Sequence, residues 1–172
     1  IPIAIFVTTL ISSLQLTAQE FKSLDKSPMD MAAFPSSYKI SDKIVKVIYS
    51  RPQLKGRSLV KLAPPEKIWR TGANEAAEIT FYKDVVFGGE ALKAGTYSLF
   101  TIPSTDGDWT VIINRARNVW GSYYYKQDQD VVRVSGKTTK IEESLEAFSM
   151  MFDKDMTLKI GWGKTVVSVS IK

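Results

Sequence analysis

The residues best suited to bind a ligand lie between positions 51 and 75. The candidates are Arg51, Arg57, Trp69, Arg70, Asn74 and Glu75. Arginine presents a planar fork of donors that fits a carboxylate or a phosphate. Gly72 allows a tight turn, which would present Asn74 and Glu75 from a loop. The alternative is structural: Arg70 and Glu75 form an internal ion pair, and Trp69 packs in the core.

The composition excludes much of enzyme chemistry. The chain of 172 residues contains no Cys and no His, which removes thiol nucleophiles, disulfides, triads with histidine, and metal sites built on imidazole or thiolate. Asp106-Gly107-Asp108 offers too few oxygen ligands for calcium and is expected to form a turn. The acidic residues at 142–146 lie in one segment, not on separate strands flanking a cleft. We therefore predict no catalytic residue, no metal and no cofactor, and the sequence favours a protein that is not an enzyme.

Positive charge is concentrated in one part of the chain. Nine basic residues lie between Lys39 and Arg70, against Asp42 and Glu66, so this segment carries +7 and the remainder −2. Such a segment can attract a polyanion. The candidate partners are an anionic glycan or an envelope protein, and nucleic acid is not expected. The favoured alternative is that the lysines cover the solvated face of an edge strand, where they also block edge-to-edge pairing.

Aromatic residues suggest a second kind of site. Trp109, Trp120 and the run Tyr123-Tyr124-Tyr125 could bind a carbohydrate, because exposed rings stack on sugar faces. Three consecutive tyrosines cannot all point inward in a strand, so at least one is expected to be exposed. The tryptophans are expected to pack in the core.

The elements that must position these residues are short β-strands. Apolar and polar residues alternate, and turn signals recur roughly every ten residues. The expected strands cover 44–49, 78–82, 85–87, 95–102, 109–114, 131–134, 148–152, 157–162 and 165–171. Gly88-Gly89 predicts a two-residue hairpin, and Gly163-Lys164 predicts a turn between the last two strands. One helical turn is expected at 139–146, where Thr139 and Glu142 have capping-box spacing.

These elements predict an all-β fold, a single antiparallel β-sandwich of about eight or nine strands over residues 44–172. Pro28 and Pro35 favour extended or turn geometry in the residues before them, so 20–43 is expected to be an extended N-terminal arm. Residues 1–19 are typical of a secretory signal peptide, truncated at its start, with cleavage after Ala18 or Gln19. We therefore expect a periplasmic or extracellular protein that keeps no stable membrane anchor after cleavage.

Four stretches of the sequence carry a family resemblance. They are Leu24 to Met31, Tyr49-Ser50-Arg51-Pro52 continuing to Arg57, Ile68-Trp69-Arg70-Thr71-Gly72-Ala73-Asn74-Glu75-Ala76, and Ala94 to Pro103. Together they resemble a family of secreted bacterial domains of unknown function, numbered twenty-nine eleven, over nearly the whole chain after the leader. The resemblance implies an extracytoplasmic β-rich domain and assigns no activity, cofactor or substrate. Residues 58–65 depart from the family's pattern, so this loop is expected to differ in shape.

The sequence therefore predicts an exported protein that serves as a non-catalytic binding or interaction module of the bacterial envelope. One alternative is an enzyme that works without His or Cys on a glycan or phosphoester, with Glu75 in a cleft near a second acid. The other is a structural envelope subunit, which requires a large exposed apolar patch.

Overall fold

A computed structural model describes residues 21–172 of the chain. The predicted signal peptide at residues 1–19 lies outside the described residues. The nine strands are β1 (Met29–Phe34), β2 (Val45–Ser50), β3 (Ala77–Phe81), β4 (Val85–Phe87), β5 (Glu90–Leu92), β6 (Gly95–Ile102), β7 (Trp109–Asn114), β8 (Asp130–Phe152) and β9 (Leu158–Val169). A short helix, α1 (Leu59–Leu62), and a 3-10 turn, η1 (Gln127–Gln129), lie in the connections. No helix within residues 21–172 is long and apolar enough to span a membrane.

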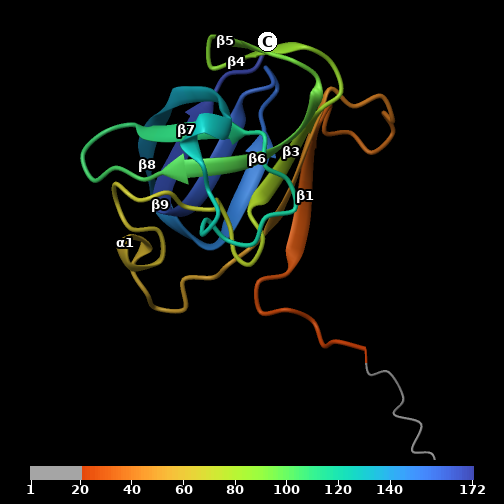
Figure 1. Cartoon of the computed structure of the whole chain (residues 1–172). Coiled ribbons are helices and arrows are strands. Elements are labelled where there is room, and N and C mark those ends of the chain that lie inside the picture. The colour runs from red at the N-terminus through yellow and green to blue at the C-terminus, as the bar shows by residue number, and fades with distance from the viewer. Residues whose placement is uncertain (1–20) are drawn as a thin grey trace, which may run out of the picture.

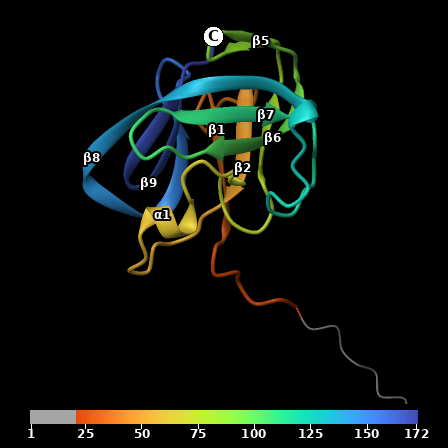
Figure 2. The ribbon, with the colours of Figure 1, turned by 60° about the vertical axis from the view of Figure 1, so that its left-hand side comes forward.

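Seven strands form one antiparallel sheet, and two form a small hairpin. The order in the large sheet is β1-β2-β3-β6-β7-β8-β9, and β4 pairs with β5. The large sheet curls so that β3, β6 and β7 face β9 across the interior (Figures 1 and 2). The predicted all-β class with about nine antiparallel strands is confirmed.

The predicted arm contains the edge of this sheet. β1 pairs with β2 from Met29 opposite Ser50 to Phe34 opposite Val45. The lysine-bearing segment that was expected as an edge strand, β2, is therefore an inner strand between β1 and β3. Three of the nine basic side chains in the 39–70 segment bond to oxygen atoms of the protein itself: Lys43, Arg51 and Arg57.

Two local predictions near the C-terminus are wrong. β8 is one strand of 23 residues, so no helical turn forms at 139–146. Pairing with β9 on both sides of this segment keeps it extended and outweighs the capping-box signal. β9 runs without a turn through Gly163, whose φ is 56° and which lies opposite Leu145 at a shift in register. The glycine therefore marks a bulge between long strands. The hairpin predicted at Gly88-Gly89 is confirmed, with φ values of 59° and 100°.

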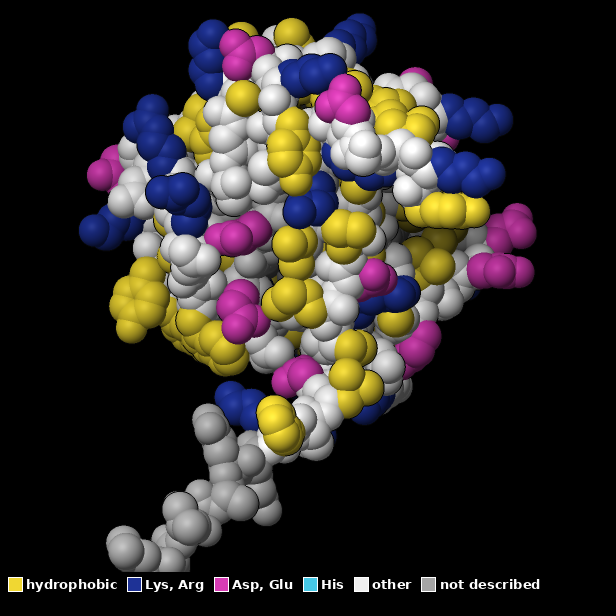
Figure 3. Space-filling model, turned by 90° about the vertical axis from the view of Figure 1, so that its right-hand side faces the viewer, with side chains coloured by type: hydrophobic (Ala, Val, Ile, Leu, Met, Phe, Trp, Pro, Cys, Tyr) yellow, Lys and Arg dark blue, Asp and Glu magenta, His cyan; other side chains and the backbone are white. Residues whose placement is uncertain are grey.

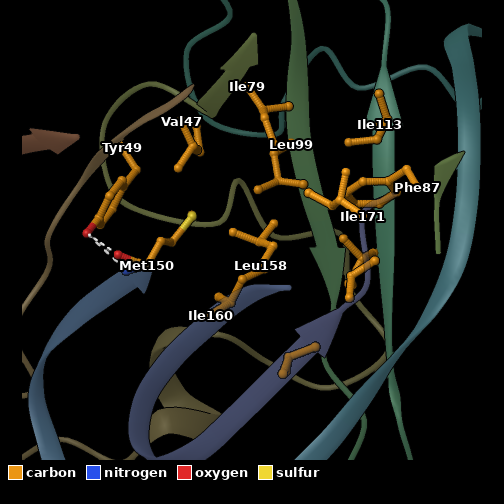
Figure 4. Close-up of a cluster of buried hydrophobic side chains, with 14 of the residues drawn as sticks. Val47, Tyr49, Ile79, Phe87, Leu99, Ile113, Met150, Leu158, Ile160 and Ile171 are labelled. Carbon is orange, nitrogen blue, oxygen red and sulfur yellow. Dashed lines mark hydrogen bonds between the residues drawn. The ribbon is translucent and has the colours of Figure 1, made fainter. Parts of the chain in front are cut away.

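One core fills the space inside the curled sheet. Figure 4 shows side chains from both halves of the sheet meeting there, among them Val47, Ile79, Leu99 and Leu158. Trp69 stacks on Trp162 with ring centroids 5.6 Å apart and packs edge-on against Phe148 at 5.1 Å. This interior leaves the outer face of β2, β3 and β6 to position the candidate site.

Candidate ligand-binding site

A hollow of about 230 Å³ opens on the outer face of the sheet beside β1 and β2. Apolar side chains from Met29, Ile48 and Ala76 line it together with the polar residues Glu75, Glu78 and Asn118; Tyr49 and Ser50 complete the lining. Figure 3 shows the face of the molecule that carries β1, where hydrophobic, acidic and basic side chains lie interspersed. The hollow therefore combines apolar surface with two carboxylates.

Strand alternation explains why these residues meet. Val47 and Ile79 are fully buried in the core, so Ile48 and Glu78, the next residue and the preceding one on their strands, point to the outer face. Ile48 lies directly opposite Glu78 in the β2–β3 register, and Met31 lies opposite Ile48 in the β1–β2 register. Residues directly opposite on paired strands share one face of the sheet.

The segment between β7 and β8, residues 115–129, covers the rest of this outer face. Its Val119 and Tyr125 pack on a second buried cluster formed by Ala76, Phe100 and Ile112. Backbone bonds join it to the 74–76 segment, from Ala76 N to Val119 O at 3.0 Å and from Gly121 N to Asn74 O at 2.9 Å. Its Asn118 N–H donates to Glu78 Oε1 at 2.6 Å. The segment thus forms one wall of the hollow and orients the Glu78 carboxylate.

A polar network fixes the far end of the 115–129 segment. Tyr125 Oη donates to Asp130 Oδ2 at 2.7 Å. Arg133 Nη1 donates to Tyr125 Oη and to the same Asp130 Oδ2, each at 2.9 Å. Asn114 Nδ2 donates to the other Asp130 oxygen at 2.8 Å. Burial and the Asp130 carboxylate raise the pKa of Tyr125 to about 12. The neutral phenol is therefore the form that holds the segment against the sheet.

The 115–129 segment carries three exposed aromatic residues. Trp120, Tyr123 and Tyr124 have 56%, 79% and 74% of their surface exposed. The prediction of at least one exposed tyrosine is confirmed, whereas the prediction that the tryptophans lie in the core is wrong for Trp120. The other three tryptophans are buried. Trp120 forms an isolated antiparallel bridge with Glu75, which places its backbone beside the lining of the hollow.

Three of the predicted site residues, Arg51, Arg57 and Trp69, do not line the hollow. Arg51 donates to Phe148 O, to Ser149 Oγ and to Asp30 Oδ2, the last at 3.0 Å. Arg57 donates to two backbone carbonyls of its own turn. Trp69 is in the core, as its structural alternative required.

The remaining three predicted residues lie around the 120–123 turn. Glu75 lines the hollow, and Asn74, at a left-handed φ of 61°, accepts the Gly121 N–H. Arg70 Nη1 lies 3.9 Å from the point that a Cβ on Gly121 would occupy. Arg70 Nε is buried with no hydrogen-bond partner. Among residues 21–172 no ion pair joins Arg70 to Glu75. The alternative of an internal ion pair between these two residues is therefore wrong.

A known protein family matches the chain over most of its length. The model of the family described as Protein of unknown function (DUF2911) matches residues 27–171. The chain belongs to this family. The match runs from just before β1 to the residue before the C-terminal Lys172, so it confirms the resemblance found in the sequence. No curated protein and no solved structure matches the chain.

In this DUF2911 chain, Glu78 and Asn118 are among the residues of the hollow that the sequence analysis did not select. Glu78 could have been found, because it alternates with the buried Ile79 on a predicted strand. Asn118, at a left-handed φ of 56°, carries no sequence signal for its place, which depends on how the 115–129 segment folds back. In the part of the chain that the structure describes, no cluster of three or more acidic side chains is arranged to hold a metal ion.

Proposed function

We propose that this DUF2911 protein is a non-catalytic binding module. The hollow lined by Glu75 and Glu78 binds a sugar, and it prefers a sugar that carries an amine. The observation that carries the proposal is the pairing of two carboxylates with apolar surface in one hollow. Sugars present polar edges and apolar ring faces, and this lining offers partners for both.

The charge of the hollow selects among sugars. Glu78 Oε1 already accepts the Asn118 N–H, which leaves the other carboxylate oxygen to accept from a ligand. Glu75 is exposed and adds a second negative charge. An amine-bearing sugar gains from both charges, whereas an anionic glycan is repelled by them. A lysine side chain presented by an envelope protein offers the same chemistry.

Export belongs to the same proposal. The uncharged apolar run from Ile1 to Ala18 supports secretion to the periplasm or the cell surface, where a glycan ligand would be encountered. Cell fractionation of the full-length precursor tests this part. Mature protein in the periplasm or medium supports it, and protein retained in the cytoplasm at full precursor mass contradicts it.

Calorimetric titration with glucosamine tests the binding function. Glu78→Gln keeps an acceptor for Asn118 but removes the charge, so affinity for glucosamine should fall by about tenfold. Glu90→Gln, an exposed glutamate on the separate β4–β5 hairpin, is the matched control and should bind like the wild type. Glucose should bind more weakly than glucosamine. Equal binding of the two sugars, or equal affinity in the two variants, would contradict the proposal.

A second candidate function follows from the two carboxylates sharing one hollow. Two acids flanking a glycosidic bond are the minimal machinery of a glycosidase. Incubation of the wild type and Glu75→Gln with chromogenic glycosides distinguishes this enzyme from a binding module. Turnover that is lost in Glu75→Gln supports catalysis, and the absence of turnover with intact glucosamine binding supports the module.

A further inference from the structure

We propose a second site, for the oxyanion group of a small phosphorylated or carboxylated ligand, in the groove between α1, the β6–β7 loop and the bulge of β8 and β9. The groove has a volume of about 260 Å³ and shares no residue with the hollow beside Glu78. Figures 1 and 2 show α1 on the same side of the molecule as the β6–β7 loop. This site goes beyond the proposed sugar-binding function and does not depend on it.

The polar lining of the groove consists of donors. Lys140, Lys164, Ser104, Thr105 and Thr165 contribute ammonium or hydroxyl groups, and no acidic side chain lines it. Among the residues that the structure describes, neither lysine forms an ion pair. Two ammonium groups and the hydroxyls of Ser104 and Thr165 can donate to an oxyanion, which accepts several hydrogen bonds, whereas the Thr105 hydroxyl donates to Asp106.

One of these groups is buried and already oriented. Thr165 is 4% exposed, and its Oγ1 accepts a hydrogen bond from Lys140 Nζ at 3.0 Å. An ammonium can only donate, so the hydroxyl hydrogen of Thr165 remains free to donate to a ligand, and Lys140 keeps two further N–H groups. Lys140 and Thr165 therefore offer donors whose positions are fixed by the hydrogen bond between them.

The second lysine lies next to the bulge of β8 and β9. Lys140 lies opposite Thr165 in the β8–β9 ladder, and the register then shifts until Leu145 lies opposite Gly163. Lys164 is exposed and Thr165 is buried, as the alternation along a strand predicts. Both residues line the groove, next to the bulge at Gly163, whose left-handed φ is 56°.

Acidic groups near the groove offset only part of this charge. Asp106 and Asp108 line an adjoining depression that also contains Lys137 and Lys140. Asp108 Oδ1 accepts the Thr138 N–H at 2.7 Å, and Asp106 Oδ2 accepts the Thr105 hydroxyl at 3.4 Å. Apolar residues complete the groove itself, including Leu59 and the half-exposed Val60 of α1. The ligand should therefore combine one oxyanion with an apolar part.

Titration of the wild-type protein with inorganic phosphate and, separately, with glucuronic acid at constant ionic strength tests this site. NMR of backbone amides should show shifts at Thr165 and Ser104. Lys164→Gln and Thr165→Val should each weaken binding by about tenfold, since the first removes a positive charge and the second removes a hydroxyl donor to a charged group. Lys154→Gln, an exposed lysine in the β8–β9 turn, is the matched control and should leave binding unchanged.

Binding of phosphate alone supports a phosphate ester, binding of glucuronic acid alone supports an acidic sugar, and binding of both supports a general oxyanion site. No binding of either anion, a response matched by chloride, or unchanged affinity in both groove variants would overturn the proposal. Glu78→Gln separates the two sites, because it should lower glucosamine affinity and leave phosphate affinity unchanged. Lys164→Gln should do the reverse.

Discussion

Tyr49 joins the two halves of the curled sheet through one hydroxyl group. Its Oη donates to Met150 O at 3.2 Å and accepts the Met150 N–H at 2.9 Å, although the two residues lie far apart in sequence (Figure 4). The side chain is 3% exposed, and its ring packs edge-on against Phe148. Burial raises the pKa of this tyrosine, consistent with a neutral hydroxyl that bridges β2 and β8.

Tyr49→Phe should therefore destabilise the protein without changing its fold. The variant leaves a buried N–H and a buried carbonyl of Met150 without their partner, which costs about 1–3 kcal/mol. Urea unfolding monitored by tryptophan fluorescence measures this loss. Tyr82→Phe, at an exposed tyrosine, is the control and should change the free energy of unfolding little. Equal stability of the two variants would contradict the bridging role.

Tyr125 makes stability depend on pH in the alkaline range. Burial and Asp130 raise its pKa to about 12 from the ordinary 10.0. A raised pKa means that the unfolded chain loses the proton first, so the contribution is complete below pH 10.0 and is lost as pH rises to about 12. The wild type should lose stability more steeply over this range than Tyr125→Phe. Parallel pH profiles of the two proteins in urea unfolding would show that Tyr125 is not coupled to folding.

At the scale of elements, the 120–123 turn holds the exposed rings in place. Gly121 has a left-handed φ of 65°, and a Cβ there would approach the Tyr123 ring to 2.8 Å. Gly56 has a similar φ of 74° with no atom within 4 Å of such a Cβ. Alanine at either position should cost about 1 kcal/mol of backbone strain.

Only Gly121→Ala should also weaken glucosamine binding, because its methyl group clashes with the Tyr123 ring and disturbs the turn whose Gly121 N–H bonds to Asn74, next to Glu75 of the hollow. Gly56→Ala is the matched control for strain without a clash. Denaturant unfolding and calorimetric titration of both variants measure the two effects separately. Unchanged binding in Gly121→Ala would show that the position of the turn does not matter for the ligand.

Local patterns predicted the elements that depend on local chemistry. Alternation identified β2, β6 and β7, and Gly88-Gly89 identified the β4–β5 hairpin, because two positive φ values are required within the turn itself. Gly163 was predicted from the same kind of signal to form a turn, and this prediction was wrong. Its positive φ occurs at a bulge where it lies opposite Leu145, a residue distant in sequence. The difference between a turn and a bulge lies in the partner strand, which a single segment does not reveal.

The candidate site was only partly predictable for the same reason. Glu75 was selected from the stretch 68–76, and Glu78 could have been selected from the alternation along its strand. The hollow itself exists because residues 115–129 fold back over β6 and β7 and bring Asn118 within 2.6 Å of Glu78. Arg51 was selected for its chemistry, and an internal ion pair with Asp30 occupies it. Contacts between segments distant in sequence decided these outcomes.

At the scale of the whole molecule, two openings of opposite charge lie on separate parts of one rigid sheet. The hollow beside β1 and β2 carries Glu75 and Glu78, and the groove beside α1 carries Lys140 and Lys164. None of the nine basic residues of the 39–70 segment lines either opening. A ligand that carries both an amine and an oxyanion could bind at either opening. Two such ligands could also be bound at once, one at each opening.

An NMR titration of the isotope-labelled protein, residues 20–172, with glucosamine tests the central claim most directly. The backbone amide of Asn118 and the indole N–H of Trp120 should shift most, in a saturable manner, and Glu78→Gln should abolish most of the change. The buried indoles of Trp69 and Trp162 serve as internal references and should stay in place. Saturable shifts confined to other faces of the protein, or no shifts at all, would contradict a sugar-binding hollow at Glu75 and Glu78.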